Sequence, residues 1–525
     1  MKRQNGFEPQ EVLGWFEEIS AIPRGSEKEE KIAAYLMDFA RKRGLCATCD
    51  SWNNVLIRKA AAAGYENCPT VIIQGHSDMV CEREAGVAHD FETEGLDLYV
   101  EDGLLRARGT TLGADNGIAL ALGLALLDSD KILHPQLEVV FTAAEEIGMI
   151  GARHFDMAQL QGRNMINLDA GGFTEGRICA GCAGSDKFQL MQTLRLREIF
   201  PKEGSRMVRI CIAGLVGGHS GGDIDKGRGN ASVLLGRLLR NMLQGCPEAE
   251  LLRWQCGDPK STVKHTIPAA AQAVFLCGEH SPVEDIVKAF QAEVAEELRG
   301  VDDGARVWMQ VLESDGWEES IDSQSAEGES AAWRRTESEN AGGQAGVVAI
   351  EHSCAQDIAD ILLLLPCGVL AWHPDFAGTP RLSVNVGNVE QHGDRLLYFV
   401  SARSETEAGL DQVEAKLRTL SRLKHLSLEM EERIPGWSHD PDSRLQALVG
   451  GLYKELYGKA PRFLITHAST ECGMFRRELS GLDIVSLGPI IYEEHTVREY
   501  MELASVGEVW RFLQLLLLRM KEVQP

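Results

Sequence analysis

Residues 136–146 read QLEVVFTAAEE, a short β-rich run that ends in two adjacent glutamates, and the glycine-punctuated segment IGMIGA follows at 147–152. Consecutive side chains of an extended segment point to opposite sides. If one face of this strand packs against a helix layer, Glu145 and Glu146 cannot both be idle solvent groups. We therefore expect the two glutamates to have different roles at the end of a buried strand.

The surrounding sequence alternates helical and strand patterns. Helical spacing is found in EVLGWFEEISAI (11–22) and EEKIAAYLMDFARKRG (29–44), and TVIIQGH (70–76) is a second short β-rich run. This alternation predicts an α/β fold in which helices flank a mixed central sheet. In such sheets function gathers at strand ends.

A second α/β region is expected between the two parts of the first. Strand and helix pieces such as SRMVRICIAGL (205–215) and LDQVEAKLRTLSRL (410–423) are separated by glycine-rich turns. Residues 316–346 are rich in Ser, Glu and Gly with little periodicity, which predicts a mobile surface insertion without chemistry. The expected organisation is a first domain formed by 1–184 and 435–525, interrupted by a second, inserted domain at 185–434.

Composition excludes several classes of function. The 525-residue chain carries 53 basic and 78 acidic residues, and its formal net charge of −25 would repel a nucleic acid backbone. No run of about 18 apolar residues and no apolar signal segment are present, so no membrane association is expected. Thirteen cysteines without a dense framework suit a reducing compartment. These observations predict a cytoplasmic protein.

Two cysteine pairs have the spacing CxxC. Cys46/Cys49 and Cys179/Cys182 are far apart in the sequence and lack the flanking turns of a zinc ribbon. Buried free thiols, and not a structural zinc site, are the favoured interpretation of both pairs.

Polar residues follow several of the predicted strands and turns. His76 and Asp78 end VIIQGHSDMV, Asp115 lies in a glycine-flanked turn before an apolar helix, and Asp169 ends NMINLDAGG. A solvated histidine with a turn-forming aspartate is the simpler explanation of the first pair. Asp115 could be a helix N-cap, although Asn116 could fill that role.

Taken together, His76, Asp115, Glu146 and Asp169 favour a metal site. Imidazole and carboxylate ligands suit zinc, manganese or cobalt, and their spread over the chain is typical of a catalytic site. Two metals about 3.5 to 4 Å apart need a bridging carboxylate and a further histidine. The downstream candidates for that histidine are His219, His467 and His495.

Motifs along nearly the whole chain point to one family. They include FEEISAIPRGSEKEE, QGHSDMVCE, GTTLGADNGIA, EEIGMIGA, GGHSGGDIDKGRGNA, LPCGVLAW, IPGWSHDPDS, HASTECGMF and SLGPIIYEEHT. In this order and spacing they resemble the aminoacyl-histidine dipeptidases, also called cytosol non-specific dipeptidases. That family lies within the co-catalytic zinc peptidases that include aminoacylase and carnosinase.

The resemblance implies two zinc ions per chain, with cobalt or manganese as substitutes. By analogy His76 and Asp169 hold one ion, Glu146 and His495 hold the other, and Asp115 bridges them. No inferred metal ligand is missing from this sequence.

The resemblance also assigns the two remaining acids of the motifs. Asp78 would orient His76, and Glu145 would be the general base that takes the proton of the metal-bridged water. One glutamate of the pair would thus bind metal while its neighbour moves a proton.

The resemblance makes 1–184 and 435–525 the catalytic domain and the inserted domain at 185–434 a lid that contacts the substrate. His219 resembles the family histidine that stabilises the tetrahedral oxygen, and Arg403 the arginine that grips the substrate carboxylate. A surface ion pair is the alternative for Arg403. The glycine-rich loop around His219 could also be read as a phosphate cradle, but it lacks the Lys-Ser/Thr ending of a P-loop.

Two further histidines match positions near the family pocket. His265 lies in HTIPA, where the family usually has Asn-Ala before Ile-Pro, and His467 lies in HASTECG, where a buried hydrogen-bonded histidine is the alternative. The sequence also departs from the family after Asp169, because the usual Ser-Glu is Ala170-Gly171.

The sequence therefore predicts a two-domain metallopeptidase that cleaves dipeptides, either Xaa-His or of broader range. Closure of the lid would bring His219 and Arg403 to the metals. A homodimer is a further expectation from the resemblance. The alternatives are a deacylase of N-acyl amino acids from the same clan and a non-catalytic zinc-binding homologue.

Overall fold

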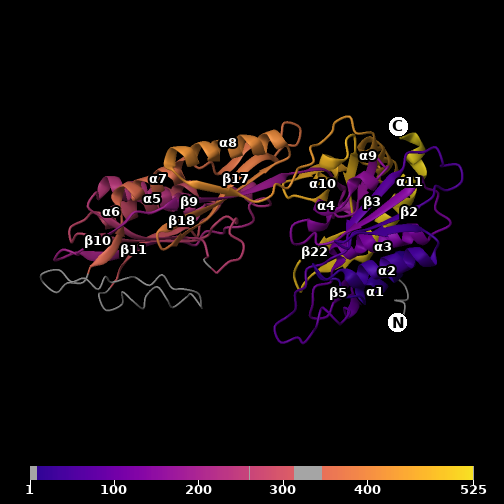
Figure 1. The fold of residues 1–525 in the computed structure, drawn as a ribbon, viewed down its shortest axis with the longest axis horizontal. Coiled ribbons are helices and arrows are strands. Elements are labelled where there is room, and N and C mark those ends of the chain that lie inside the picture. The colour runs from indigo at the N-terminus through magenta and orange to yellow at the C-terminus, as the bar shows by residue number, and fades with distance from the viewer. Residues whose placement is uncertain (1–8, 259, 313–345, 524–525) are drawn as a thin grey trace. The chain divides into compact units, whose positions relative to one another are not determined.

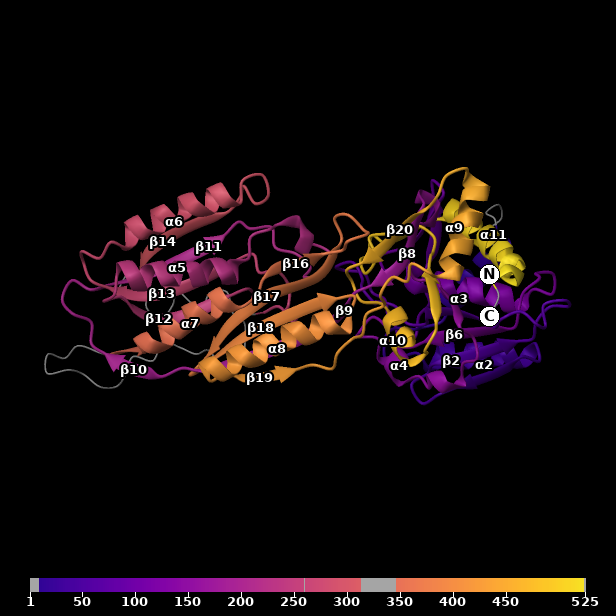
Figure 2. The ribbon, with the colours of Figure 1, turned by 90° about the horizontal axis from the view of Figure 1, so that it is seen from above.

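The computed structural model describes residues 9–258, 260–312 and 346–523, and the chain divides into two compact units. Unit 1 comprises residues 1–182 and 435–525, and unit 2 comprises residues 183–434. The expected insertion at 316–346 lies, except for its last residue, outside the described residues. The predicted mixed α/β fold with an inserted α/β domain is confirmed (Figures 1 and 2).

Unit 1 is built on an eight-stranded mixed sheet in the order β1-β2-β6-β3-β7-β21-β8-β20. Its strands are β1 (Cys46–Cys49), β2 (Val55–Lys59), β3 (Val71–His76), β6 (Leu137–Thr142), β7 (Asn164–Asn167), β8 (Arg177–Cys182), β20 (Arg462–Thr466) and β21 (Asp483–Ser486). The neighbours β6, β3, β7 and β21 run parallel, so their carboxyl ends meet at one edge of the sheet.

Helices cover both faces of this sheet. The helices of unit 1 are α1 (Gln10–Ser20), α2 (Glu30–Lys42), α3 (Ala114–Asp128), α4 (Ile150–His154), α9 (Arg444–Tyr457), α10 (Glu471–Glu478) and α11 (Leu503–Arg519). α1, α2, α3, α9 and α11 share one apolar core with side chains such as Ile73, Val139 and Phe141. α10 lies over the opposite face, where its Glu471 contacts Thr142.

α3 is apolar on all sides and lies very close to β3. A side chain on Gly75 would bring its Cβ within 2.4 Å of both the Ala119 Cβ and the Asn116 Oδ1, so only glycine fits at this point of β3. This contact places the end of β3, which carries His76, directly against the start of α3, which carries Asp115.

A smaller four-stranded sheet, in the order β22-β23-β5-β4, completes unit 1. Its strands are β4 (Leu98–Glu101), β5 (Leu104–Ala107), β22 (Ile491–Tyr492) and β23 (Tyr500–Glu502). The segment between β22 and β23 contains His495. This sheet therefore anchors both ends of the loop that carries that histidine.

Unit 2 is a nine-stranded antiparallel sheet covered by helices. The main path is β14-β11-β13-β12-β17-β18-β9-β19, and β16 pairs with β17. The strands are β9 (Gly184–Thr193), β11 (Arg206–Ala213), β12 (Glu250–Cys256), β13 (Ala271–Cys277), β14 (Arg306–Leu312), β16 (Gly368–Trp372), β17 (Pro380–His392), β18 (Arg395–Ser404) and β19 (Ser427–Met430), with β10 (Leu196–Ile199) and β15 (Val347–Ile350) as a separate pair. The helices are α5 (Ala231–Gly245), α6 (Val283–Glu297), α7 (His352–Leu364) and α8 (Glu407–Lys424), and all four contribute to one apolar core on the sheet (Figure 2).

Two global expectations can be compared with the structure. All thirteen cysteines are free thiols. The prediction that the two CxxC pairs are buried is confirmed for Cys179 and Cys182 and is wrong for Cys46 and Cys49, which are exposed because they lie on the edge strand β1. Among the helices of the described ranges, none combines the length and apolarity needed to cross a membrane.

Candidate metal centre

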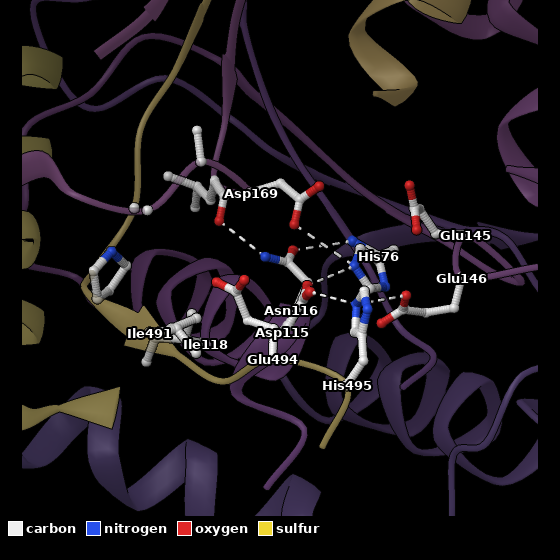
Figure 3. Close-up of a pocket in the computed structure, with 15 residues that line it drawn as sticks. His76, Asp115, Asn116, Ile118, Glu145, Glu146, Asp169, Ile491, Glu494 and His495 are labelled. Atoms are coloured by element: carbon white, nitrogen blue, oxygen red, sulfur yellow. Dashed lines mark hydrogen bonds and ion pairs between the residues drawn. The ribbon is translucent and has the colours of Figure 1, made fainter. Parts of the chain in front are cut away.

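A pocket of about 180 Å³ opens at the carboxyl ends of the parallel strands of unit 1 (Figure 3). It is rich in ionisable side chains, and no lysine or arginine is among its lining residues in the described part of the chain. The lining residues are His76, Asp115, Asn116, Ile118, Glu145, Glu146, Leu168, Asp169, Ala170, Gly171, Gly488, Pro489, Ile491, Glu494 and His495. All five residues expected to bind metal are among them, and so is Glu145.

Each of the five comes from a different element. His76 is the last residue of β3, Asp169 follows β7, and Glu146 lies in the turn after β6. Asp115 lies at the start of α3, and His495 lies between β22 and β23. The alternation of strands and helices thus brings these five side chains from both parts of unit 1 to one pocket.

Asp115 lies between the two histidines. Its Oδ1 is 3.1 Å from His76 Nε2, and its Oδ2 is 3.2 Å from His495 Nε2. Asp169 Oδ1 lies 3.6 Å from the first imidazole, and Glu146 Oε2 lies 3.0 Å from the second. Each imidazole therefore has one further carboxylate beside it, and the two oxygens of Asp115 point in two directions.

The donor set fits a divalent metal ion. One ligand atom each from His76, Asp115 and Glu146 lie within 4.8 Å of one another. Glu146 Oε1 is buried without a hydrogen-bond partner in the described chain, which is costly for a carboxylate oxygen unless a cation meets it. Imidazole nitrogen and carboxylate oxygen are the ligands of zinc, manganese and cobalt sites.

The pKa values of these groups reflect a high density of negative charge. Burial lowers the pKa of His76, but its hydrogen bonds with Asp115, Asp169 and Asp78 outweigh burial and raise it well above the ordinary value. Hydrogen bonds with Asp115 and Glu146 raise the pKa of His495 to about 11. Burial raises the pKa of Asp169 to about 6. Such a cluster stabilises a cation held at its centre.

Asp78 links His76 to the glutamate pair. Its Oδ1 lies 3.2 Å from His76 Nδ1 and accepts the Glu145 backbone N–H at 3.0 Å. Its Oδ2 accepts the Glu146 backbone N–H at 3.2 Å and the Ser26 hydroxyl at 2.8 Å. A hydrogen bond from Nδ1–H to this carboxylate leaves the Nε2 lone pair of His76 directed into the pocket, as a metal ligand requires.

The two glutamates differ in environment, but not for the reason expected from the strand pattern. β6 ends at Thr142, and the left-handed backbone of Ala144 (φ 50°) turns the chain before the pair. The alternation of an extended segment therefore does not apply, and the hydrogen bonds of Asp78 fix the turn instead. Glu146 faces His495, whereas the Glu145 carboxylate makes no hydrogen bond within the described residues.

Burial also raises the pKa of Glu145 well above its ordinary value. The effects of Asp169, Glu471 and Glu146 act in the same direction, while His76 opposes them. Glu145 is thus an unbonded carboxyl group that holds its proton more readily than a solvated one.

The N-terminus of α3 is not capped by either of the two residues expected from the sequence. Asp115 and Asn116 have non-helical backbone angles, and neither side chain caps the helix. Asn116 accepts the His76 backbone N–H at 3.2 Å and donates to the Leu168 carbonyl at 3.0 Å, so it joins the ends of β3 and β7. The prediction that Asn116 could be the N-cap is therefore wrong.

Glu499 performs the capping instead, and the sequence reasoning missed it. This buried carboxylate accepts the backbone N–H groups of residues 112, 113, 114 and 115 at 2.8 to 3.3 Å. A negative charge at a helix N-terminus is favourable, and here it fixes the backbone of Asp115. The acid that follows His495 by four residues was the available signal.

Two other buried groups were not assigned a role from the sequence. Arg24 donates to the carbonyls of Ser77 (3.2 Å), Asp78 (2.9 Å) and Gly113, so it links the His-x-Asp segment to the start of α3. Glu471 accepts hydrogen bonds from Gln74 at 2.5 Å and from Thr142 at 2.7 Å. Both lie within motifs of the sequence, IPRGS and STECG.

His219 and Arg403 lie together in unit 2. Arg403 Nη2 is 3.5 Å from His219 Nε2. His219 Nδ1 accepts the backbone N–H groups of Gly222 (2.9 Å) and Gly221 (3.3 Å), so its remaining proton is on Nε2. Arg403 Nη2 and His219 Nε2 are therefore two neighbouring N–H donors, an arrangement suited to an anionic or carbonyl oxygen.

Arg403 is not a surface ion pair within the described residues. Burial lowers the pKa of its guanidinium to about 10, and no carboxylate acts on it in the opposite direction. A partly buried guanidinium without an acid partner is costly unless an anion binds to it.

The other two histidines are placed differently. His265 belongs to unit 2, where burial lowers its pKa to about 4, and the neighbouring Ile267 N–H donates to the Gly218 carbonyl at 2.8 Å. The His265 segment is thus tied to the loop of His219. His467 is a mostly buried residue that follows β20 in unit 1, and it does not line the pocket.

An α/β sheet whose strand ends gather imidazoles and carboxylates into one pocket, with a free carboxyl group beside them, defines a metal-dependent hydrolase. A family model described as peptidase family M20/M25/M40 matches residues 72–519, and the chain belongs to this family. The protein is accordingly a metallopeptidase.

Individual relatives resemble the chain over its whole length. The cytosol non-specific dipeptidase of Escherichia coli strain K12 is 33% identical over 520 residues, which cover 98% of this chain and 99% of that protein. The crystal structure of an aminoacylhistidine dipeptidase from Vibrio alginolyticus has a TM-score of 0.84 and 28% identity, covering 100% of this chain and 99% of the other. An aminopeptidase PepT structure from Bacillus cereus, with a TM-score of 0.58, 13% identity and coverage of 98% and 99%, shares the fold.

Replacing Glu499 tests how the Asp115 segment is held. In Glu499→Gln a neutral amide accepts fewer and weaker hydrogen bonds from residues 112–115, so we expect unit 1 to lose about 2–3 kcal/mol of unfolding free energy. Calorimetric unfolding of the purified variant measures this loss. Glu478→Gln, at an exposed glutamate paired with Arg477, is the control. An unchanged transition in Glu499→Gln would show that the cap contributes nothing.

Proposed function

We propose that this protein hydrolyses dipeptides with free amino and carboxyl termini, using two zinc ions. His76 and Asp169 would hold one ion, Glu146 and His495 the other, and Asp115 would bridge them. The observation that carries this assignment is the position of Asp115, whose two oxygens lie 3.1 and 3.2 Å from two different imidazoles. The relatives named as dipeptidases match this chain end to end.

Divalent ions at these ligands would polarise the peptide carbonyl and lower the pKa of a bound water to about 7. Glu145 takes one proton from the attacking water and passes it to the leaving amino group. The peptide C–N bond is exchanged for a C–O bond, and the products are two amino acids. Asp78 fixes the glutamate turn through the backbone N–H groups of residues 145 and 146.

Unit 2 supplies the remaining interactions with the substrate. His219 donates its Nε2–H to the carbonyl oxygen as negative charge develops there. Arg403 binds the C-terminal carboxylate, which provides the anion that its buried guanidinium lacks. His265 and His467 are assigned to the surroundings of the substrate. A site that holds both the free carboxylate and the free amino group of its substrate restricts the enzyme to very short peptides.

The proposed compartment is the cytoplasm. Thirteen free cysteines suit a reducing environment, and the Escherichia coli relative is named as a cytosolic enzyme. A homodimer, also implied by the resemblance, is the proposed assembly.

A small substrate panel tests the function. Metal-stripped protein should be inactive, and zinc, manganese or cobalt should restore cleavage of β-Ala-His, Gly-His and Leu-Gly but not of a tripeptide or of N-acetyl-Met. Amino acid release measured by chromatography gives the rates, and elemental analysis gives the metal content. Cleavage of N-acetyl-Met alone would identify a deacylase, and inactivity with two ions bound would identify a non-catalytic homologue.

Substitutions of the two adjacent glutamates should impair the enzyme in different ways. Glu145→Gln removes the proton acceptor, so kcat should fall by about 10² to 10⁴-fold while KM and the metal content stay unchanged. Glu146→Gln removes a ligand beside His495 and should lower the metal content. Steady-state kinetics and elemental analysis separate these effects. Full turnover by Glu145→Gln with bound metal would refute its role as general base.

The role of Arg403 can be tested with substrates that differ at the C-terminus. For a dipeptide with a free carboxylate, Arg403→Lys should lower kcat/KM by about 10 to 100-fold, because the planar two-point contact is lost. The corresponding dipeptide amide should be a poor substrate for both proteins, at equal rates. Arg395→Lys changes an exposed arginine at the start of the same strand and serves as the control. Equal losses on the acid and the amide would contradict carboxylate binding.

A further inference from the structure

One carboxylate of the pocket has no part in the proposed chemistry. Five acids line it, namely Asp115, Glu145, Glu146, Asp169 and Glu494. The first four are assigned to metal binding and proton transfer. Glu494 is not, although Figure 3 shows its side chain directed into the pocket.

The local backbone presents Glu494 to the pocket. Its neighbours Glu493 (φ 55°) and His495 (φ 62°) both have left-handed backbone angles, so a tight turn surrounds it. Thr496 closes this turn, because its hydroxyl donates to the Glu493 carbonyl at 2.8 Å. The direction of Glu494 is thus fixed by the same loop that carries His495.

Glu494 differs sharply from the adjacent glutamate. Glu493 forms an ion pair with Arg498 at 2.9 Å. The Glu494 carboxylate forms no hydrogen bond or ion pair with any residue in the described ranges, and it lies in a pocket whose described lining contains no lysine or arginine. Its charge is available for a ligand.

Charge balance indicates what that ligand carries. The four assigned carboxylates match the charge of two divalent ions, so Glu494 adds one uncompensated negative charge. The nearby lining includes apolar Ile118, Pro489 and Ile491, which do not neutralise it. A carboxylate against apolar surface gains most from a cationic partner that brings its own hydrogen-bond donors.

We propose that Glu494 binds the α-ammonium group of the N-terminal residue of the substrate and so selects peptides with a free amino terminus. This inference rests on the proposed dipeptidase function, which supplies a ligand with an ammonium group two bonds from the scissile carbonyl carbon. Glu494 is a specificity-determining residue in this assignment. It excludes N-acylated amino acids, which lack that positive charge.

The test compares two substrates that differ only in this group, Ala-His and its des-amino analogue propionyl-His. Wild-type protein should prefer Ala-His by about 10-fold or more. In Glu494→Gln, kcat/KM for Ala-His should fall by about 10 to 100-fold, chiefly through KM, while the rate on propionyl-His stays unchanged. Metal content should equal that of the wild type. Glu493→Gln, which removes the neighbouring charge paired with Arg498, should behave as wild type on both substrates.

The outcomes separate the two proposals. Wild-type protein that cleaves neither substrate would refute the dipeptidase function itself. Active wild type together with an unchanged substrate preference in Glu494→Gln would refute ammonium binding by Glu494. Equal losses on both substrates, or loss of metal, would show that Glu494 supports the His495 loop and would overturn its role in specificity.

Discussion

The architecture of unit 1 depends on one electrostatic constraint, which is that carboxylates gathered in a buried pocket must each meet a cation or N–H donors. Within the described residues several acids in and around the pocket meet this requirement, whereas the pocket carboxylates of Glu145 and Glu494 do not. Asp115, Glu146 and Asp169 lie beside imidazoles at the positions proposed for metal. Asp78 accepts two backbone N–H groups besides its contacts with His76 and Ser26, and Glu499 accepts four backbone N–H groups. Both acids therefore organise the chain without adding ligands for metal. Some aspartates and glutamates are thus placed to bind a metal ion, and others stabilise the backbone around the site.

The pattern of the sequence located the pocket but not its internal construction. Apolar runs that end in His76 and Asp169 can be read as strands, and the ends of parallel strands meet, so their proximity follows from the pattern. The position of Glu499 cannot be predicted in this way, because it contacts the backbone of residues 112–115, which lie up to 387 positions away in the sequence. The local pattern also predicted an extended segment at Glu145 and Glu146, where the structure has a turn held by the Asp78 side chain. Long-range polar contacts carry little signal in local periodicity.

Arg403 and His219 in unit 2 show what the structure adds to the sequence motifs. Without the resemblance, a surface ion pair would be the default explanation of Arg403. In the structure burial lowers the pKa of Arg403, and no carboxylate of the described residues opposes this effect. Two backbone N–H groups donate to Nδ1 of His219 and so place its proton on Nε2. The hydrogen bonds of a glycine-rich loop therefore determine which nitrogen of His219 carries the proton, which the motif alone does not specify. The glycines of GGHSGG provide those N–H groups at short range.

The strand order of unit 1 also governs how the chain reaches its native state. β21, which comprises Asp483–Ser486, lies between β7 and β8, so a segment near the C-terminus fills the middle of a sheet begun by the N-terminal third. During synthesis the ribosome releases all of unit 2, a continuous segment of 183–434, before this strand emerges. The N-terminal strands must therefore wait, with an open edge at β7, while the inserted domain completes its own fold. The nascent enzyme becomes capable of catalysis only when its last segment closes that gap.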